Sequence, residues 1–141
     1  MAKPSDRATL EDRAEFMLRK VHPSQIKAGR PSKTTFLPRP ADEMQLSVDR
    51  SSIVSSNDCY AAYAAMKHFH IGEGGVWAVT VGECNAHAMH CLGDPLVEGE
   101  PSGPNPAHAL IDMSHLTEAA MHNAATQLYV IAKARGKLAP P

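Results

Sequence analysis

Three stretches of the chain have the hydrophobic pattern of β-strands. Residues 76–81 (VWAVTV) are apolar at nearly every position, which predicts a strand at the centre of a sheet. Residues 108–113 (HALIDM) predict a second buried strand. Residues 44–49 (MQLSVD) alternate apolar and polar side chains, so this strand is predicted to be half-buried, with Ser47 facing outward.

Three other stretches have helical spacing. Apolar residues recur at helical intervals through residues 6–20, which predicts a first helix that ends before Pro23. Ser55 or Ser56 can cap a second helix over residues 58–70. A long helix over residues 117–135 is predicted to end at Gly136.

The remaining segments are rich in turn-forming residues. Prolines at 23, 31, 38 and 40 exclude a long helix from residues 21–40 and predict an ordered loop or a short hairpin, in which residues 34–37 alone have strand character. Residues 92–106 contain four prolines and three glycines and predict a flexible loop. Residues 82–91 favour neither helix nor strand, and residues 137–141 form a tail.

The order of these elements predicts the fold class. Strands are too few and too irregularly spaced for repeated βαβ units, so we expect an α+β fold, with a small mixed or antiparallel sheet flanked by helices. A chain of 141 residues with 43% hydrophobic content fits one domain, spanning residues 1–141.

Charge is unevenly distributed along the chain. Residues 19–50 carry seven Lys and Arg against three Asp and Glu, whereas residues 51–141 carry four against eight. A basic segment beside an acidic body suits an anionic small molecule or an acidic protein partner, and an excess of four charges is too small to favour nucleic acid. No apolar run is long enough for a membrane span or a signal peptide, so we expect a cytoplasmic protein.

A cluster of potential metal ligands lies at Cys84, His87, His90 and Cys91. Structural zinc sites recruit two ligand pairs from separate elements, and this spacing does not supply them. A histidine-rich turn is therefore favoured over a metal site, and we assign no metal. The three cysteines of the chain include no CxxC pair, which fits reduced thiols.

A more diffuse set of polar residues could form a ligand site. Glu83 follows the apolar strand 76–81, where a carboxylate can serve as a catalytic base or as an anchor for a ribose hydroxyl, although charged residues at strand ends are often simply solvated. The other candidates are Ser47 for catalysis and three residues for ligand binding, His22, Arg30 and Tyr60.

His108 and Asp112 fall on the same face of the predicted strand 108–113. A core histidine held by a carboxylate is the commoner outcome of such a pair. The alternative is that the pair activates a nucleophile, either Ser47 or Cys84.

Several motifs together resemble a small bacterial protein family with no assigned activity; they are HP at 22–23, GRPS at 29–32, FLP at 36–38, LSVD at 46–49, GVWAVTVGE at 75–83, DP at 94–95 and PAHA at 106–109. The order of the first motifs is also similar to RES-type and other ADP-ribosyltransferase-like folds. That similarity implies NAD or a phosphorylated ribose as ligand, with Arg30 or His22 at its phosphate or nicotinamide end. It further implies that Ser47 belongs to the motif on the next strand and that Glu83 is the acidic residue that follows later in the chain, where such folds hold the ligand.

Two functions follow as hypotheses. The first is a domain that binds an anionic nucleotide-type ligand, with NAD among the candidates, in a cleft between residues 22–50 and Glu83. The second is a non-catalytic accessory protein that docks on a protein partner through its proline-rich segments, since proline-fixed loops lose little entropy on binding. The sequence leaves open whether the protein is an enzyme.

Overall fold

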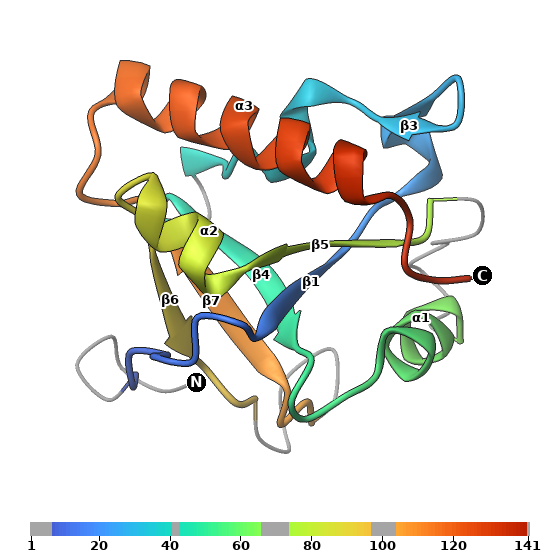
Figure 1. Ribbon diagram of the computed structural model, residues 1–141. Helices are drawn as coiled ribbons and strands as arrows, with labels where there is room; N and C mark the ends of the chain where they lie inside the picture. Colours follow the sequence, from blue (N-terminus) through green and yellow to red (C-terminus); the bar gives the residue numbers. More distant parts are fainter. Residues whose placement is uncertain (1–6, 41–42, 66–73, 97–103, 141) are drawn as a thin grey trace.

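A five-stranded antiparallel sheet organises the computed structural model, which describes residues 7–40, 43–65, 74–96 and 104–140 (Figure 1). Its strands are β1 (Phe16–Lys20), β4 (Gln45–Arg50), β5 (Val76–Thr80), β6 (His90–Gly93) and β7 (His108–Asp112). They lie in the order β5-β1-β4-β7-β6, and each neighbouring pair is antiparallel. The expected α+β class is confirmed, as are the strands that we predicted over 44–49 and 108–113.

The described residues include three α-helices beside the sheet: α1 (Ser56–Ala64), α2 (Val81–Ala86) and α3 (Glu118–Arg135). The Ser55 side chain caps α1, as predicted, by accepting a hydrogen bond from the Asp58 amide. The predicted end of this helix at residue 70 lies outside the described residues. Thr117 caps α3 in the same way, and Gly136 ends it with φ 91°, so the prediction of a helix over 117–135 is confirmed.

The two faces of the sheet are covered differently. Helix α3 lies across one face, where it packs on the larger apolar core with Met17, Val48 and Ile111. Helix α1 lies on the opposite side, near β1 and β5, over a smaller cluster that includes Leu18 and Cys59 (Figure 1). No helix among the described residues is long and apolar enough to cross a membrane.

The proline-rich segment after β1 forms an ordered hairpin. It consists of a 3₁₀ turn η2 (Pro23–Gln25), the short paired strands β2 (Ile26–Lys27) and β3 (Arg30–Pro31), and a second 3₁₀ turn η3 (Lys33–Phe36). A strand over residues 34–37 was the wrong prediction. Phe36 is fully buried in the core, and a tight turn rather than an extended chain brings it there.

The predicted helix over residues 6–20 is also wrong, because its last third is β1. Met17 and Leu18 are both buried, but in clusters on opposite faces of the sheet. Adjacent residues reach opposite faces only in a strand. A strand buried on both faces lacks polar alternation, so its apolar positions can fit a helical spacing equally well.

The strand over 76–81 exists as β5, but it lies at an edge of the sheet rather than at its centre. It is buried because α3 packs against it and because the C-terminal segment pairs with its free side. Val76 exchanges backbone hydrogen bonds with this segment, through its amide to Ala139 O at 2.7 Å and through its carbonyl from the Leu138 amide at 2.8 Å. An apolar run therefore indicated burial and not position in the sheet.

The segment that we predicted as a flexible loop over 92–106 is partly ordered. β6 extends to Gly93, the next residue Asp94 is buried, and Leu96 pairs with Asn105. Residues 97–103 lie outside the described part of the chain.

Candidate functional site

The candidate site lies where β1 separates from β4, the central strand of the sheet. β1 and β4 pair at Met17↔Arg50 and Leu18↔Asp49, whereas β1 pairs with β5 along all five of its residues. Beyond Leu18 no further residues of β1 pair with β4 in the described part of the chain, and residues of η2, of η3 and of the segment 37–40 line the space between them. A pocket with a volume of about 720 Å³ opens there.

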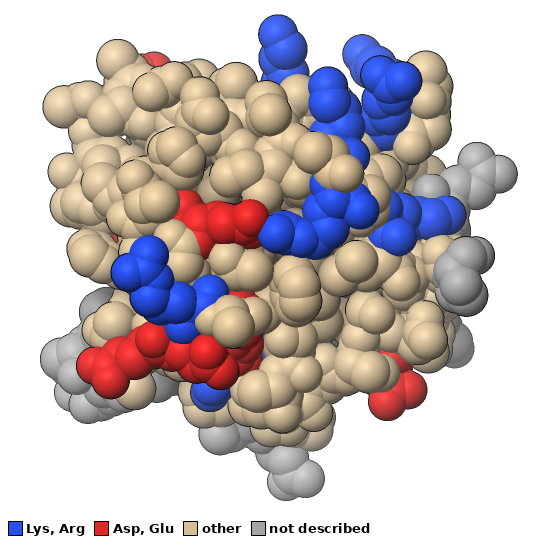
Figure 2. Space-filling model, viewed as in Figure 1, with Lys and Arg blue, Asp and Glu red and all other residues tan. Residues whose placement is uncertain are grey.

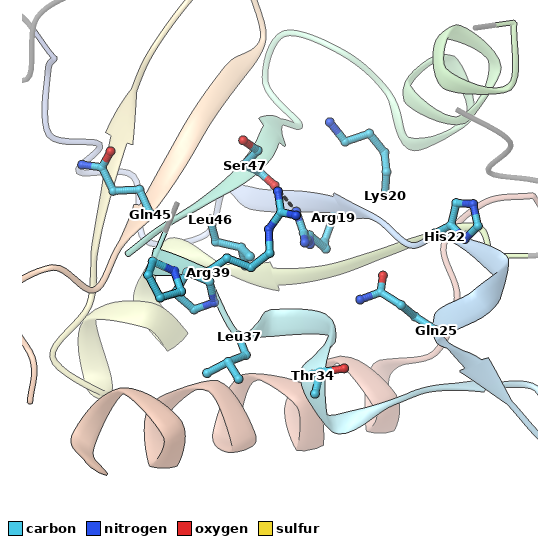
Figure 3. Close-up of a pocket in the computed structure, with 12 residues that line it drawn as sticks. Arg19, Lys20, His22, Gln25, Thr34, Leu37, Arg39, Gln45, Leu46 and Ser47 are labelled. Atoms are coloured by element: carbon cyan, nitrogen blue, oxygen red, sulfur yellow. Dashed lines mark hydrogen bonds between the residues drawn. The ribbon is translucent and has the colours of Figure 1, made fainter. Parts of the chain in front are cut away.

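Basic and polar side chains surround this pocket, which we call the basic pocket. Figure 3 shows β4 residues at one end and the η2 residues at the other. Lys20 and Ser47 project toward the side of α1, and Thr34 and Leu37 lie on the side of α3. No Asp or Glu is among the described lining residues, which are Arg19, Lys20, His22, Gln25, Thr34, Leu37, Pro38, Arg39, Pro40, Gln45, Leu46 and Ser47.

Arg19 holds the gap between the strands open. Its Nη1 donates to the carbonyl oxygen of Ser47 at 2.9 Å, and its Nε donates to the carbonyl oxygen of Thr35 at 3.1 Å. The guanidinium thus replaces a backbone partner that β1 would otherwise offer to β4. It places a permanent positive charge in the wall of the pocket.

Lys20 is the most deeply buried cation of the pocket. Its side chain is 6% exposed, and its ammonium lies 3.9 Å from Asp49 Oδ2 and 3.6 Å from the centre of the Tyr63 ring. Burial lowers the pKa of Lys20 to about 8, although the nearby Asp49 carboxylate opposes this shift. Asp49 also accepts hydrogen bonds from Cys59 Sγ at 3.3 Å and from Asn105 Nδ2 at 3.0 Å.

The hydroxyl of Ser47 is part of a second buried polar chain. Ser47 Oγ lies 3.2 Å from His108 Nε2. On the other side of the ring, His108 Nδ1 lies 3.1 Å from Asp94 Oδ2, and Asp94 Oδ1 accepts a hydrogen bond from Arg7 Nε at 2.9 Å. The carboxylate beside His108 is therefore Asp94 and not Asp112, which the strand pattern had suggested.

The predicted site residues do not all meet in this pocket. Ser47 and His22 line it, but Arg30, Tyr60 and Glu83 are not among its lining residues. Arg30 is exposed on β3, and Tyr60 packs against the smaller core from α1. Figure 2 shows basic side chains gathered over the β2–β3 hairpin and the C-terminal end of α3, the region of Arg30.

Glu83 has a local structural role. Its side chain accepts a hydrogen bond from the Thr80 amide at 2.7 Å, while Thr80 Oγ1 accepts one from the Glu83 amide, which forms a capping box at the start of α2. Two hydrogen bonds join the carboxylate to Arg135. Burial alone would raise the pKa of Glu83, but the hydrogen bonds from Arg135 and Thr80 outweigh it and lower the pKa.

The Cys84–Cys91 segment likewise packs into the structure. Both cysteines are buried, and their mutual hydrogen bond, followed by burial, raises the pKa of Cys84. His90 is exposed, and its ring faces that of His115 at 5.1 Å between centroids. Among the described residues no group of three or more His, Cys, Asp and Glu side chains could hold a metal ion.

The residues that were not predicted include Arg19, Lys20, Arg39 and Gln45 of the basic pocket and Asp94 of the polar chain. Arg19 and Lys20 are adjacent basic residues at the end of an apolar stretch, and this pattern could have indicated a binding site. The prediction of a helix over the same residues obscured it. Asp94 had no usable signal, because it approaches His108 only through the pairing of β6 with β7.

Comparisons of the chain with protein-family models, with curated proteins and with solved structures return no match. The chemistry of the basic pocket must therefore be inferred from its own geometry.

Proposed function

We propose that the protein binds a small anionic ligand, with a phosphate group or a similar anion, in the basic pocket. The observation that carries this proposal is the gathering of Arg19, Lys20 and Arg39 around one cavity of about 720 Å³. Cavities of several hundred Å³ are typical of small-molecule sites. An anion in this cavity would gain electrostatic attraction from these cations, of which Lys20 already faces the Asp49 carboxylate.

The neutral lining residues favour an ordered ligand over diffuse counterions. Gln25, Thr34 and Gln45 present amide and hydroxyl groups around the same cavity, and these groups can fix the orientation of a bound molecule. Leu37 and Leu46 add apolar surface for an uncharged part of the ligand. This combination fits a small organic anion such as a nucleotide, which has both charged and uncharged parts.

NAD remains one candidate within this class. Of the residues that the similarity to ADP-ribosyltransferase-like folds implies, Ser47 and His22 line the pocket. Glu83 pairs with Arg135 elsewhere, so it supplies no carboxylate to this cavity. The proposal is therefore for binding of the anion, with no transfer of ADP-ribose assigned.

Calorimetric titration with inorganic phosphate, ADP and NAD tests the proposal, with uncharged adenosine as the comparison ligand. We expect at least one anion to bind and adenosine not to. Thermal unfolding provides a second measurement, because a ligand at 100 times its dissociation constant stabilises the folded state by about 2.7 kcal/mol. Failure of all three anions to bind or stabilise the protein would overturn the proposal.

Two charge-removing variants locate the site. Arg39→Gln removes a cation that lines the basic pocket, and Arg30→Gln removes a cation on the neighbouring hairpin. We expect Arg39→Gln to weaken anion binding about tenfold or more, since hydrogen bonds to charged groups contribute about 1.5–3 kcal/mol. Arg30→Gln serves as the matched control and should change the affinity little. The reverse result would move the ligand to the hairpin.

A further inference from the structure

The ring nitrogens of His108 have defined roles. Nδ1 lies 3.0 Å from the carbonyl oxygen of Asp94 and 3.1 Å from its Oδ2. A carbonyl oxygen can only accept a hydrogen bond, so Nδ1 carries a proton and donates it. In the neutral imidazole Nε2 then has a free electron pair, and the hydrogen bond of 3.2 Å runs from the Ser47 hydroxyl to Nε2.

This arrangement gives each group the function that it has in a serine nucleophile site. The hydroxyl of Ser47 is paired with a base, and the base is oriented by a buried carboxylate. Asp94 and His108 have side chains that are 1% and 10% exposed, so solvent does not compete for their hydrogen bonds. Arg7 Nε holds the second oxygen of Asp94 at 2.9 Å, which fixes the orientation of the carboxylate.

Ser47 also lies beside the cations of the basic pocket. Lys20 and Ser47 both line this pocket, and Lys20 Nζ lies 3.9 Å from Oδ2 of Asp49, two residues along β4 from Ser47. Figure 3 shows that both side chains project toward the side of α1. A positive charge at this position can stabilise an oxyanion that develops when the serine attacks a carbonyl group.

We propose that Ser47 is a catalytic nucleophile, with His108 as its general base and Asp94 as a positioning residue, for hydrolysis of a carboxylic ester that carries an anionic group. The serine mechanism follows from the hydrogen-bond geometry. The anionic class of the substrate rests on the proposed function of the basic pocket.

The reaction needs only the ester and water. The Ser47 proton passes to His108 Nε2 while Oγ bonds to the carbonyl carbon, whose π electron pair moves to the oxygen. When this intermediate collapses, the bond to the alcohol breaks, and the alcohol leaves with the proton from Nε2. Water then attacks the acyl-serine by the same route, which releases the carboxylic acid and returns the proton to Ser47.

Labelling with diisopropyl fluorophosphate tests the nucleophile without requiring the natural substrate. The reagent is uncharged, so its reaction does not depend on anion binding. We expect one adduct by intact mass, located on Ser47 by peptide mapping and absent in Ser47→Ala. His108→Gln should slow labelling by about 10²–10⁴-fold, the usual contribution of a general base. The control Asp112→Asn should react like the wild type, because Asp112 is on the same strand without contacting His108.

The positioning role of Asp94 is tested by a measurement that reports more than the stability of the variant. In Asp94→Asn we expect slower labelling together with a change in the ¹⁵N shifts of His108, because Nδ1–H loses its carboxylate partner although the Asp94 backbone carbonyl still accepts its hydrogen bond. If the variant melts lower but keeps the wild-type ¹⁵N shifts and labelling rate, Asp94 is structural and its assignment as a positioning residue is wrong.

Two further measurements distinguish a failure of this inference from a failure of the proposed function. Inorganic phosphate should slow the labelling of Ser47, and p-nitrophenyl hydrogen succinate should be hydrolysed faster than the uncharged p-nitrophenyl butyrate. Phosphate binding without any Ser47 adduct would overturn the nucleophile and leave the anion site standing. An adduct that phosphate does not slow, with equal turnover of both esters, would support the nucleophile and overturn the anionic substrate class.

Discussion

The two faces of the sheet are built from different chemistry. The face under α3 is apolar, with fully buried residues such as Val48, Ile111 and Leu128. The opposite face carries buried polar groups at the corresponding positions of the same strands, including Lys20, Asp49 and His108. The strands are shared, so alternation along each strand divides the chain into a stabilising face and a polar face.

This division places the Ser47–His108–Asp94 chain on the polar face, whereas the basic pocket also includes Thr34 and Leu37 from the side of α3. Apolar burial stabilises the fold by roughly 25 cal/mol per Å². A buried ion pair is weak support for stability, because desolvation of both charges offsets their attraction. The polar face therefore contributes less to folding than its burial suggests, and its groups are better explained by the proposed function.

The largest expected effect comes from unpairing a charge on the polar face. Asp49→Ala leaves Lys20 buried without its carboxylate and should lower the free energy of unfolding by about 3–5 kcal/mol. The double variant Lys20→Met with Asp49→Ala should recover part of this loss. Urea unfolding followed by the fluorescence of Trp77, the one tryptophan of the chain, measures both.

Ile111→Ala provides the contrast on the apolar face. It should lower the free energy of unfolding by about 2–5 kcal/mol, and Lys20→Met should not recover that loss. If Lys20→Met fails to offset Asp49→Ala as well, the two charges are not coupled and the contrast between the faces disappears.

A smaller effect concerns pH. Burial lowers the pKa of Lys20 from its usual 10.5 to about 8, so between these values the unfolded chain binds more protons at this group than the folded protein. The stability of the wild type relative to Lys20→Met should therefore rise with pH across this window, by at most about 1.4 kcal/mol per pH unit. It should be flat below pH 8.

Comparison with Lys20→Met isolates this group from its neighbours. Burial raises the pKa of both Cys59 and Tyr63, which act in the opposite direction as pH rises. Urea titrations of both proteins across the window provide the measurement. A constant difference would show that Lys20 is not desolvated.

The smallest effect is expected at Glu83, outside both faces. Glu83→Gln keeps a side chain able to complete the capping box but loses the ion pair with Arg135, so it should cost less than about 1 kcal/mol at neutral pH. Because the folded pKa of Glu83 is lowered, its contribution is present above the usual carboxyl pKa of 4.5 and is lost as pH falls below it.

Thermal melting at neutral and acidic pH measures the Glu83 contribution, with the exposed Glu11→Gln as the surface control. Loss of p-nitrophenyl hydrogen succinate hydrolysis or of phosphate binding in Glu83→Gln would contradict its local structural role. Such a result would return Glu83 to the functional site.

Patterns of period two and long amphipathic runs were predictable from the sequence. The strand around Ser47, the strand that begins at His108 and the helix capped by Thr117 all have local signals that the structure confirms. The sequence did not predict β1, because a strand buried on both faces has no alternation of apolar and polar residues to distinguish it from a helix. The prediction of a central β5 failed because apolar character records burial by any neighbour, including a helix and the C-terminal segment.

The sequence by itself determined the α+β class, excluded a long helix from the proline-rich segment after β1, and made Ser47 and His22 candidates. Tertiary structure decided which groups meet. Asp94 reaches His108 through the pairing of β6 with β7, and the basic pocket exists because β1 separates from β4 after Leu18. Contacts between residues far apart in sequence depend on strand order and register, and local hydrophobic patterns specify neither.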